Sequence, residues 1–195
     1  MFRILISLIL FLGSLLAAVG GNLVQKDLGF RYSIKENGNG SVKYNIPEYS
    51  LESFAAEDGK VYKRPVMMDA GQVSDEGQPD LPSSSTFIAI NPQKTYSINV
   101  NVLSYTVTEN IEILPKNSWD NNSEITFEKG ASYNSQGHYP EKIAMISEPM
   151  TMRELTLVNL TVTPFRYYPQ EKRLEEFTEI EIELIETGES SDIPF

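Results

Sequence analysis

Few side chains of this 195-residue chain could carry out chemistry. Cysteine is absent, and the one histidine, His138, stands in the loop-like segment GASYNSQGHYP. Three consecutive serines, Ser83, Ser84 and Ser85, offer hydroxyl groups, but no GxSxG nucleophile motif surrounds them. A serine hydrolase needs a base held beside its nucleophile, and no motif in the sequence places His138 beside a serine. The sequence therefore predicts a chain that is not an enzyme and needs no cofactor.

Acidic side chains could also bind a metal. The segment DAGQVSDEGQPDLP carries Asp69, Asp75 and Asp80 among glycines, a composition typical of calcium-binding loops. It lacks the D-x-D-x-D-G spacing of calcium ligands, so a tight turn into a strand is the simpler interpretation of these three candidates. The alternating glutamates of EIEIELIE, near residue 180, would diverge on a strand, and we expect them to face solvent and protect a sheet edge.

The charge balance excludes one class of partner. The chain has 16 lysines and arginines against 27 aspartates and glutamates, a formal net charge of −11. Nucleic-acid phosphates bind proteins of the opposite charge, so we expect no nucleic-acid partner. The absence of cysteine also excludes disulfides and thiolate metal sites, so packing alone must hold the core together.

The first residues have the pattern of a secretory signal peptide. Arg3 precedes the largely apolar run ILISLILFL, and small residues follow from Ala17 to Gly21. The run is shorter than the roughly 20 apolar residues that span a bilayer. We therefore predict a signal peptide over residues 1–20, and a secreted chain with no membrane contact after cleavage. A retained membrane anchor is the alternative.

Much of the remaining sequence alternates between polar and apolar residues with a period of two, as strands do. The Asn-Gly pairs of ENGNG predict a tight turn inside a hairpin over residues 31–45. Segment 86–114 alternates as strand, and its register slips near Leu103 as at a β-bulge. The polar segment KNSWDNNSE, residues 116–124, predicts a surface loop that carries the lone tryptophan, Trp119.

The end of the sequence alternates most clearly. Residues 156–167 predict one strand with an inward face of threonine and apolar side chains, YPQEKR predicts a turn, and residues 177–186 predict a return strand. No segment after the signal has a long helical period. We therefore predict an all-β fold, an antiparallel β-sandwich of the jelly-roll type with short loops and little helix. It should span residues 22–186, followed by a polar tail or linker over residues 187–195.

Several motifs follow one another in a specific order. GQPDLP begins at residue 77, a long alternating stretch leads into ILPK at residues 113–116, and YNSQGHYPEK leads on to PFRYYP. This order resembles the N-terminal propeptide of gingipain-type cysteine peptidases, over about residues 77–185. The residues that match the family motifs are Gly77, Pro79, Leu81, Pro82, Tyr133, Tyr139, Pro140, Pro149, Arg153, Pro164, Phe165, Tyr167 and Pro169.

The resemblance implies a prodomain that assists the folding of a secreted gingipain-like cysteine peptidase and keeps it latent by occluding its active-site cleft. The expected partner is then the cognate peptidase domain, in the same precursor or on a separate chain. In arginine-specific members of the family the inhibitory arginine lies in the loop after the segment that matches ILPK. Here NSWDNNSE contains no basic residue, so the resemblance leaves Lys116, Trp119 and Lys129 as inhibitory-loop candidates.

A different class of function stays open on the residues alone. Aromatic side chains on the rim of a secreted β-sandwich can also bind carbohydrate or a cell surface, because one fold can carry many functions. In such an adhesion module the candidate contacts would be Trp119, Tyr105, Tyr133 and Tyr139.

Overall fold

The computed structural model describes residues 29–35, 39–56, 59–72, 74–119, 125–126 and 128–190. The strands are β1 (Phe30–Ile34), β2 (Gly40–Asn45), β3 (Tyr49–Ala55), β4 (Val61–Met67), β5 (Gly71–Gln72), β6 (Pro82–Ile90), β7 (Lys94–Thr108), β8 (Ser118–Trp119), β9 (Ile125–Thr126), β10 (Ala144–Ile146), β11 (Met150–Met152), β12 (Leu155–Val162), β13 (Phe165–Tyr168) and β14 (Arg173–Glu189). A short 3-10 turn, η2, spans Ala131–Asn134.

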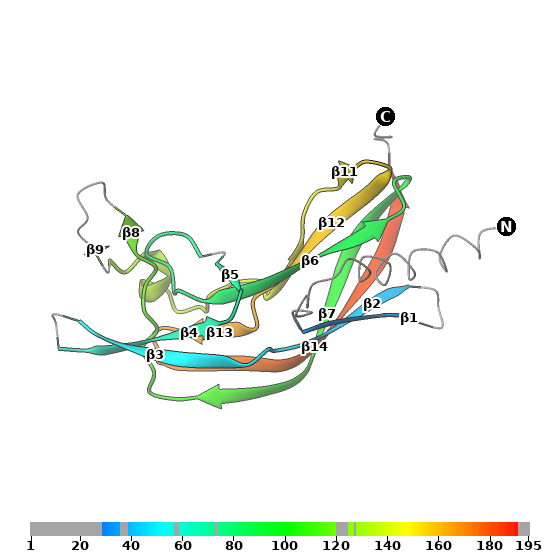
Figure 1. The fold of residues 1–195 in the computed structure, drawn as a ribbon. Coiled ribbons are helices and arrows are strands. Elements are labelled where there is room, and N and C mark those ends of the chain that lie inside the picture. Colours follow the sequence, from blue (N-terminus) through cyan, green and yellow to red (C-terminus); the bar gives the residue numbers. More distant parts are fainter. Residues whose placement is uncertain are drawn as a thin grey trace, which may run out of the picture.

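The first sheet is built around the long strand β14. β2 and β13 pair with successive parts of one edge of β14, β7 pairs along its other edge, and β1 pairs with β2. All of these pairings are antiparallel. In Figure 1, β7 and β14 run beside each other along much of their length.

The second sheet is built around β12. β6 pairs with one edge of β12, and β10 and β11 pair with successive parts of its other edge. The short strand β5 extends the sheet beyond β6. Two separate hairpins, β3 with β4 and β8 with β9, complete the fold.

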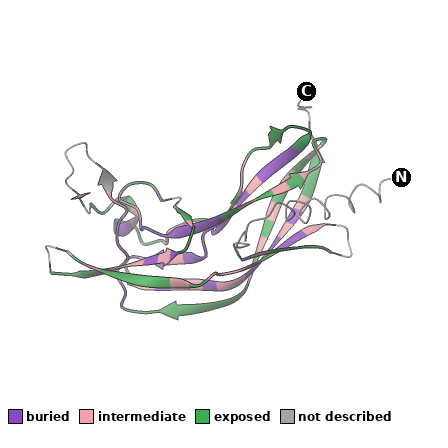
Figure 2. Cartoon of the chain, viewed as in Figure 1, coloured by how far each residue is buried: buried purple, intermediate pink, exposed green. Residues whose placement is uncertain are grey.

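The main core lies between the two sheets. The side chains of Val42, Tyr44, Ile180 and Ile182 come from the first sheet and pack with Leu160 and Val162 and their neighbours from the second. The Tyr44 and Ser84 hydroxyl groups are 3.2 Å apart and hydrogen-bond across the two layers. Burial raises the pKa of Tyr44 to about 12, so this phenol stays neutral and can donate or accept. Figure 2 shows the buried positions alternating with partly exposed ones along β12 and β14.

A second core lies at one end of the sandwich. It joins Leu81, Ile111, Ile113 and Tyr133 with Phe165 and Tyr167 of the PFRYYP motif. Phe165 and Tyr167 of β13 are 0% and 1% exposed there. The side chain of Tyr49, from β3, packs edge-on against Phe165 with the ring centroids 5.1 Å apart. This second core positions the segments described in the next subsection.

The antiparallel β-sandwich is confirmed, and so are several local predictions. β1 and β2 form the hairpin expected over residues 31–45. The register shift is also confirmed, since Glu179 of β14 pairs with Ser104 and Ile180 pairs with Val102, which leaves Leu103 as the extra residue of a bulge.

The strand predicted over residues 156–167 is wrong in one respect, because it is two strands in two sheets. β12 ends at Val162 and β13 begins at Phe165. Pro164 lies between them, and it has no backbone N–H to donate to a continuing ladder. The predicted inward face of β12 is correct, since Thr156, Val158 and Leu160 are all buried.

The glutamates of EIEIELIE do not protect a sheet edge, because β14 pairs on both sides and is central in its sheet. They form cross-strand ion pairs instead. Lys43 of β2 pairs with Glu179, and Lys35 pairs with both Glu181 and Glu183. A period of two reveals which face of a strand is wet but not which strands lie beside it.

The predicted limits of the domain fall partly within the described residues. β14 continues to Glu189, three residues beyond the expected end at Glu186, and the Ser190 N–H donates to the Gln93 carbonyl at 2.8 Å. The predicted signal peptide lies outside the described residues. Within the described ranges, no helix has the length and apolar character needed to cross a membrane.

Candidate functional site

The inhibitory-loop candidates lie within residues 115–129, which we call the excursion, between Ile113 and Tyr133 of the second core. Both ends of the excursion are hydrogen-bonded to the GQPDLP motif. The Gly77 N–H donates to the Lys116 carbonyl at 3.0 Å, and the Lys116 N–H donates to the Gln78 carbonyl at 2.8 Å. The Gly130 N–H then donates to the Gly77 carbonyl at 2.7 Å. Residues 77–78, 115–117 and 128–130, which we call the neck, therefore fix both ends of the excursion.

Glycine is required at the centre of the neck. Gly77 has φ +74°, a left-handed conformation that side chains with a Cβ rarely adopt. A Cβ at Gly77 would also lie 3.0 Å from the Gly130 nitrogen and 3.2 Å from the Glu128 carbonyl oxygen. Only glycine lets these two backbones approach so closely.

Asp80 anchors the neck from inside. Its side chain is 7% exposed, and its Oδ2 atom is 3.8 Å from a guanidinium nitrogen of Arg64. Burial raises the pKa of Asp80, and the positive charges of Arg64 and Lys116 oppose that rise. The Asp80 N–H donates to the Leu114 carbonyl at 2.8 Å. Lys116 therefore lies at the start of the excursion, within electrostatic reach of a buried carboxylate.

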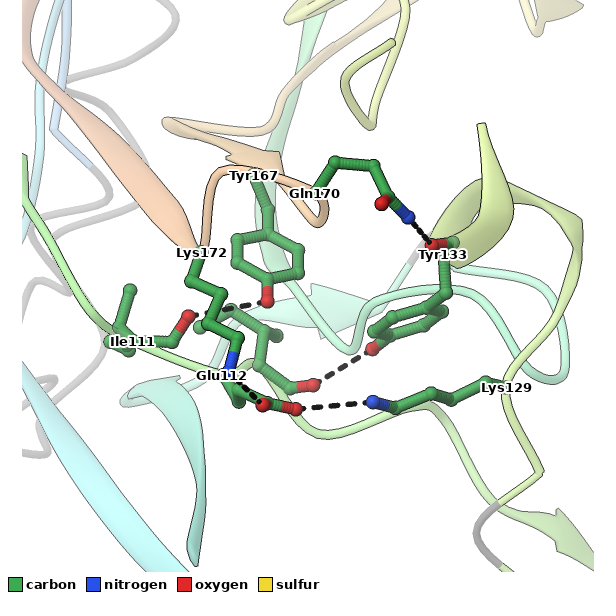
Figure 3. A network of polar contacts seen from close by, with 8 residues as sticks. Ile111, Glu112, Lys129, Tyr133, Tyr167, Gln170 and Lys172 are labelled. Carbon is green, nitrogen blue, oxygen red and sulfur yellow. Dashed lines mark hydrogen bonds and ion pairs between the residues drawn. The ribbon is translucent and has the colours of Figure 1, made fainter. Parts of the chain in front are cut away.

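Lys129 is held at the other end of the neck. Its ammonium group is 3.1 Å from a carboxylate oxygen of Glu112, whose second oxygen is 2.8 Å from the ammonium of Lys172 (Figure 3). The same ammonium lies 5.0 Å from the ring centroid of Tyr62 and 5.2 Å from that of Tyr133. These contacts are cation–π distances, so Lys129 braces the neck from two sides.

Because of Glu112, the free energy of unfolding of the domain should fall at acid pH. Its pKa is lowered, first by the hydrogen bond from Lys172 and then by Lys129, with burial opposing them. A lowered folded pKa gives stabilisation that is complete above the ordinary value of 4.5 and is lost as the pH falls through the folded pKa. We expect Glu112→Gln to lower the free energy of unfolding by about 1 kcal/mol at pH 7 and by much less at pH 3. Urea denaturation at the two pH values measures this difference.

The matched control is Glu154→Gln, in the exposed turn between β11 and β12. It should leave the free energy of unfolding almost unchanged at both pH values. An equal loss for Glu112→Gln at pH 3 and pH 7 would show that the carboxylate charge contributes nothing.

Two tyrosine hydroxyl groups hold the segment that leads into the neck, residues 111–113. The Tyr133 hydroxyl donates to the Ile113 carbonyl at 2.8 Å, and the Tyr167 hydroxyl donates to the Ile111 carbonyl at 3.2 Å. The Gln170 side-chain amide donates to the Tyr133 carbonyl at 2.6 Å (Figure 3). Burial raises the pKa of Tyr167 to about 12, so this hydroxyl remains a donor at neutral pH.

The aromatic residues considered for an adhesion module do not form one surface. Tyr133 is 6% exposed and belongs to the second core, whereas Tyr105 of β7 is 58% exposed. The Tyr139 backbone makes two hydrogen bonds with Tyr167, at 2.9 and 2.8 Å, within the same core region. Trp119 lies in β8, where its backbone pairs with Ile125, and its side chain lies outside the described residues.

The other family-motif residues lie in the core, in turns or at strand ends. Leu81 and Phe165 are core residues, and the bond between Tyr139 and Pro140 is cis. Arg153 has φ +57° in the exposed turn before β12. The prolines mark strand ends and turns: Pro79 bridges to Pro115 at the neck, Pro82 opens β6, Pro149 precedes β11, Pro164 precedes β13 and Pro169 lies in the β13–β14 turn.

The structure does not assemble the candidate hydrolase or calcium residues. Ser84 bonds to Tyr44 and Ser85 bonds to Thr161. His138 instead bonds to the Pro140 carbonyl and packs edge-on against Tyr168. Among the described residues, no three His, Cys, Asp or Glu side chains are grouped to hold a metal ion. Asp69 lies in the β4–β5 turn, Asp75 lines a surface pocket, and Asp80 faces Arg64.

Sequence reasoning missed three parts of this region. The first is Glu112, whose partners Lys129 and Lys172 are distant in sequence, and the second is the ion pair of Arg64 with Asp80. The third is Gly130, which approaches Gly77 so closely that its own Cβ would lie 3.0 Å from the Gly77 oxygen. The glycine at position 130, directly after a charged segment, was the only local signal of a close backbone approach.

Comparisons with known proteins agree with this arrangement of motifs. The Propeptide_C25 family model matches residues 30–192, which includes both ends of the neck. Gingipain R2 of Porphyromonas gingivalis is 26% identical over 159 residues, which are 80% of this chain and 22% of that protein. Gingipain R1 of the same species is 25% identical over 129 residues, or 64% of this chain. The chain thus spans about a fifth of the length of the curated gingipain R2 that it matches.

Two solved structures share the fold. The first is described as a complex of the Porphyromonas gingivalis RgpB pro- and mature domains; it has a TM-score of 0.75 at 22% identity, over 87% of this chain and 91% of that chain. The second concerns zymogenic latency of gingipain K from Porphyromonas gingivalis; it has a TM-score of 0.63 at 19% identity, over 85% of this chain and 96% of that chain. With a family model that covers residues 30–192, the chain belongs to the C25 propeptide family.

Proposed function

We propose that this chain is the secreted prodomain of a gingipain-like cysteine peptidase, and that it assists the folding of the peptidase and keeps it latent by occluding its active-site cleft. The observation that carries the proposal is the family match over residues 30–192, which spans the sandwich and the neck. The curated relatives are gingipains R1 and R2, and one related structure is described as a complex of pro- and mature domains. The chain itself is the non-catalytic part of such a pair.

The inhibitory contact is proposed to come from the excursion that the neck holds. Lys129 is already paired with Glu112, so its role is to brace the excursion. Lys116, at the start of the excursion, and Trp119 of β8 are then the contact candidates. A lysine that enters a partner's cleft needs a carboxylate there, because an unpaired buried charge is strongly destabilising. A rigid neck lowers the entropy cost of presenting such a contact.

The test is inhibition of the C25 peptidase from the same precursor or, if the chain is encoded separately, from the same genome. We expect the wild-type chain to inhibit at micromolar concentration or below. Lys116→Ala should weaken inhibition by about tenfold or more, since removal of one partner of an interfacial charge pair costs 2 kcal/mol or more, by the usual rough magnitude. Trp119→Ala is the second variant, and it tests an apolar contact in the same excursion.

The control is Lys43→Ala on β2. Lys43 pairs with Glu179 on the outer face of the first sheet, away from the neck, so its removal should leave inhibition unchanged. A folded wild-type chain that does not inhibit would exclude the latency role. If Lys116→Ala and Trp119→Ala both inhibit like the wild type, the contact lies outside this excursion.

Export through the signal peptide predicted over residues 1–20 belongs to the same proposal. The motif pattern and the gingipain relatives support it. N-terminal sequencing of the exported chain should show cleavage within residues 18–21, and an uncleaved chain that stays with the membrane would favour the anchor instead.

A further inference from the structure

The two outer faces of the sandwich differ in their chemistry. The outer face of the first sheet is rich in charge, and Lys35 and Lys43 form ion pairs there with Glu179, Glu181 and Glu183. Such a face is well solvated and internally compensated.

The outer face of the second sheet carries large apolar side chains instead. The strand registers place Met150 opposite Leu157 and Met152 opposite Leu155, on the side of β12 that faces away from the core. Met145 and Phe87 point to the same side from β10 and β6, because their partners Thr161 and Asn159 alternate with the buried residues of β12. We call Phe87, Met145, Met150, Met152 and Leu155 the methionine face.

The methionine face is exposed and uncharged. Its five side chains are between 38% and 55% exposed, and β11 is exposed along its whole length (Figure 2). The other outward positions of the described β6 and β12 hold only serine, threonine, asparagine, alanine or leucine. In a chain in which 22% of the residues are charged, this arrangement departs from an ordinary solvated sheet. Exposed apolar patches mark docking surfaces, and methionine is an adaptable contact residue.

A pocket connects the methionine face with the neck. It has a volume of about 400 Å³ and is lined by Met145, Tyr139, Leu81 and Asp75, among others. The carbonyl of Asp75 accepts a hydrogen bond from the Gln78 N–H at 3.1 Å, so the rim of the pocket continues directly into the neck. A partner that contacts the neck can therefore extend over the pocket onto the methionine face.

The far end of the methionine face lies near Ser190, the last residue that the structure describes. Thr156, next to Leu155, pairs with Ile90 at the end of β6. The turn that follows β6 includes Gln93, whose carbonyl accepts the Ser190 N–H at 2.8 Å. Ser190 therefore lies close to this end of the face.

We propose that the methionine face and the adjoining pocket bind an uncharged apolar surface of the peptidase domain, the same domain whose cleft the excursion is proposed to occlude. This inference rests on the proposed function, because it takes the partner to be the peptidase. The face supplies affinity away from the cleft, and the pocket accepts an apolar side chain as an anchor. Two separate contacts on one rigid domain would hold the excursion in place while the peptidase is latent.

The test uses binding to a peptidase whose cleft is already blocked. The C25 peptidase is capped at its active-site cysteine with an irreversible small inhibitor, and its affinity for the chain is measured by titration calorimetry. We expect the wild-type chain to bind the capped peptidase. The double variant Phe87→Lys/Met152→Lys should bind about tenfold or more weakly, because each lysine must be desolvated in an apolar contact.

The matched control places the same side chain on the opposite outer face. Asn101→Lys lies on β7 opposite Glu181, so the new lysine meets a carboxylate there and binding should not change. Thermal unfolding of all variants verifies that they are folded. Methyl NMR adds a second measurement: the signals of Met145, Met150 and Met152 should shift on binding, while that of Met67, 5% exposed in the second core, should not.

The outcomes separate the two proposals. If the wild-type chain does not bind the capped peptidase, or if the double lysine variant binds as well as the wild type, the docking surface is wrong, whether or not the chain inhibits. If the double variant loses binding but the wild type does not inhibit the free peptidase, the latency role fails and the docking surface stands. A wild-type dimer in sedimentation that the double variant dissociates would assign the face to a second copy and overturn the proposal.

Discussion

Ile180→Ala should lower the free energy of unfolding by about 3 kcal/mol, the largest effect expected for a single substitution here. Ile180 is 0% exposed in the main core, on the central strand β14, between β2 and β7. The substitution removes three buried carbon atoms from a close-packed interior and leaves a cavity between the two sheets. Urea denaturation of the chain measures the loss as a lower midpoint with an unchanged slope.

The control for this prediction is an isoleucine that is not in the core. Ile34 of β1 is 57% exposed, so Ile34→Ala should change the free energy of unfolding by about 0.5 kcal/mol or less. If Ile180→Ala cost no more than Ile34→Ala, the two sheets would not pack on each other through β14.

Gly77→Ala should open the neck and destabilise the domain by about 2–3 kcal/mol. Two costs add: the left-handed backbone at φ +74° disfavours a Cβ, and the Cβ would lie 3.0 Å from the Gly130 nitrogen. Relief of this clash must separate Gly130 from Gly77 and break the 2.7 Å hydrogen bond between them. Under the proposed function, the variant should also inhibit the peptidase at least about tenfold more weakly at temperatures where it stays folded.

Gly59→Ala separates these two costs. Gly59 also has a positive φ, +78°, but a Cβ there would meet nothing within 4 Å. We expect a loss of about 1 kcal/mol from backbone strain alone and no change in inhibition. Equal effects of the two variants on stability and inhibition would mean that the contact of Gly77 with Gly130 does not hold the excursion.

The two variants together test how stability relates to latency. Ile180→Ala damages the core between the sheets, whereas Gly77→Ala acts where the excursion is attached. In conditions where both remain folded, only Gly77→Ala should weaken inhibition strongly. If Ile180→Ala weakened it as much, inhibition would follow overall stability and not the geometry of the neck.

Local patterns in the sequence were sufficient to predict features that depend on a few adjacent residues. The turn of ENGNG predicted the β1–β2 hairpin, and the slip in alternation at Leu103 predicted the bulge against β14. Both features depend on steric preferences of a few adjacent residues. The same reasoning joined β12 to β13, because side chains on both sides of Pro164 keep the alternation while the chain crosses from one sheet to the other.

The candidate site was predicted only in part for a related reason. Lys116, Trp119 and Lys129 were chosen by their place after ILPK, but their environments depend on distant residues. The ammonium group of Lys129 pairs with Glu112 and lies near the rings of Tyr62 and Tyr133, contacts that its place in the sequence did not reveal. A local sequence pattern cannot predict such an ion pair, because its partners are distant in sequence and its strength depends on how deeply the tertiary fold buries it.

The sequence by itself determined that this protein is an acidic, cysteine-free chain of alternating strands, and the order of its turn motifs indicated the propeptide family. Only the tertiary structure decided that β14 is a central strand, that Gly77 fastens both ends of one excursion, and that the methionines of β10 and β11 gather on one uncharged face. The physical reason is that alternation and turn preferences act between neighbouring residues. Strand order, close backbone approach and shared faces arise from contacts between segments that are far apart in the chain.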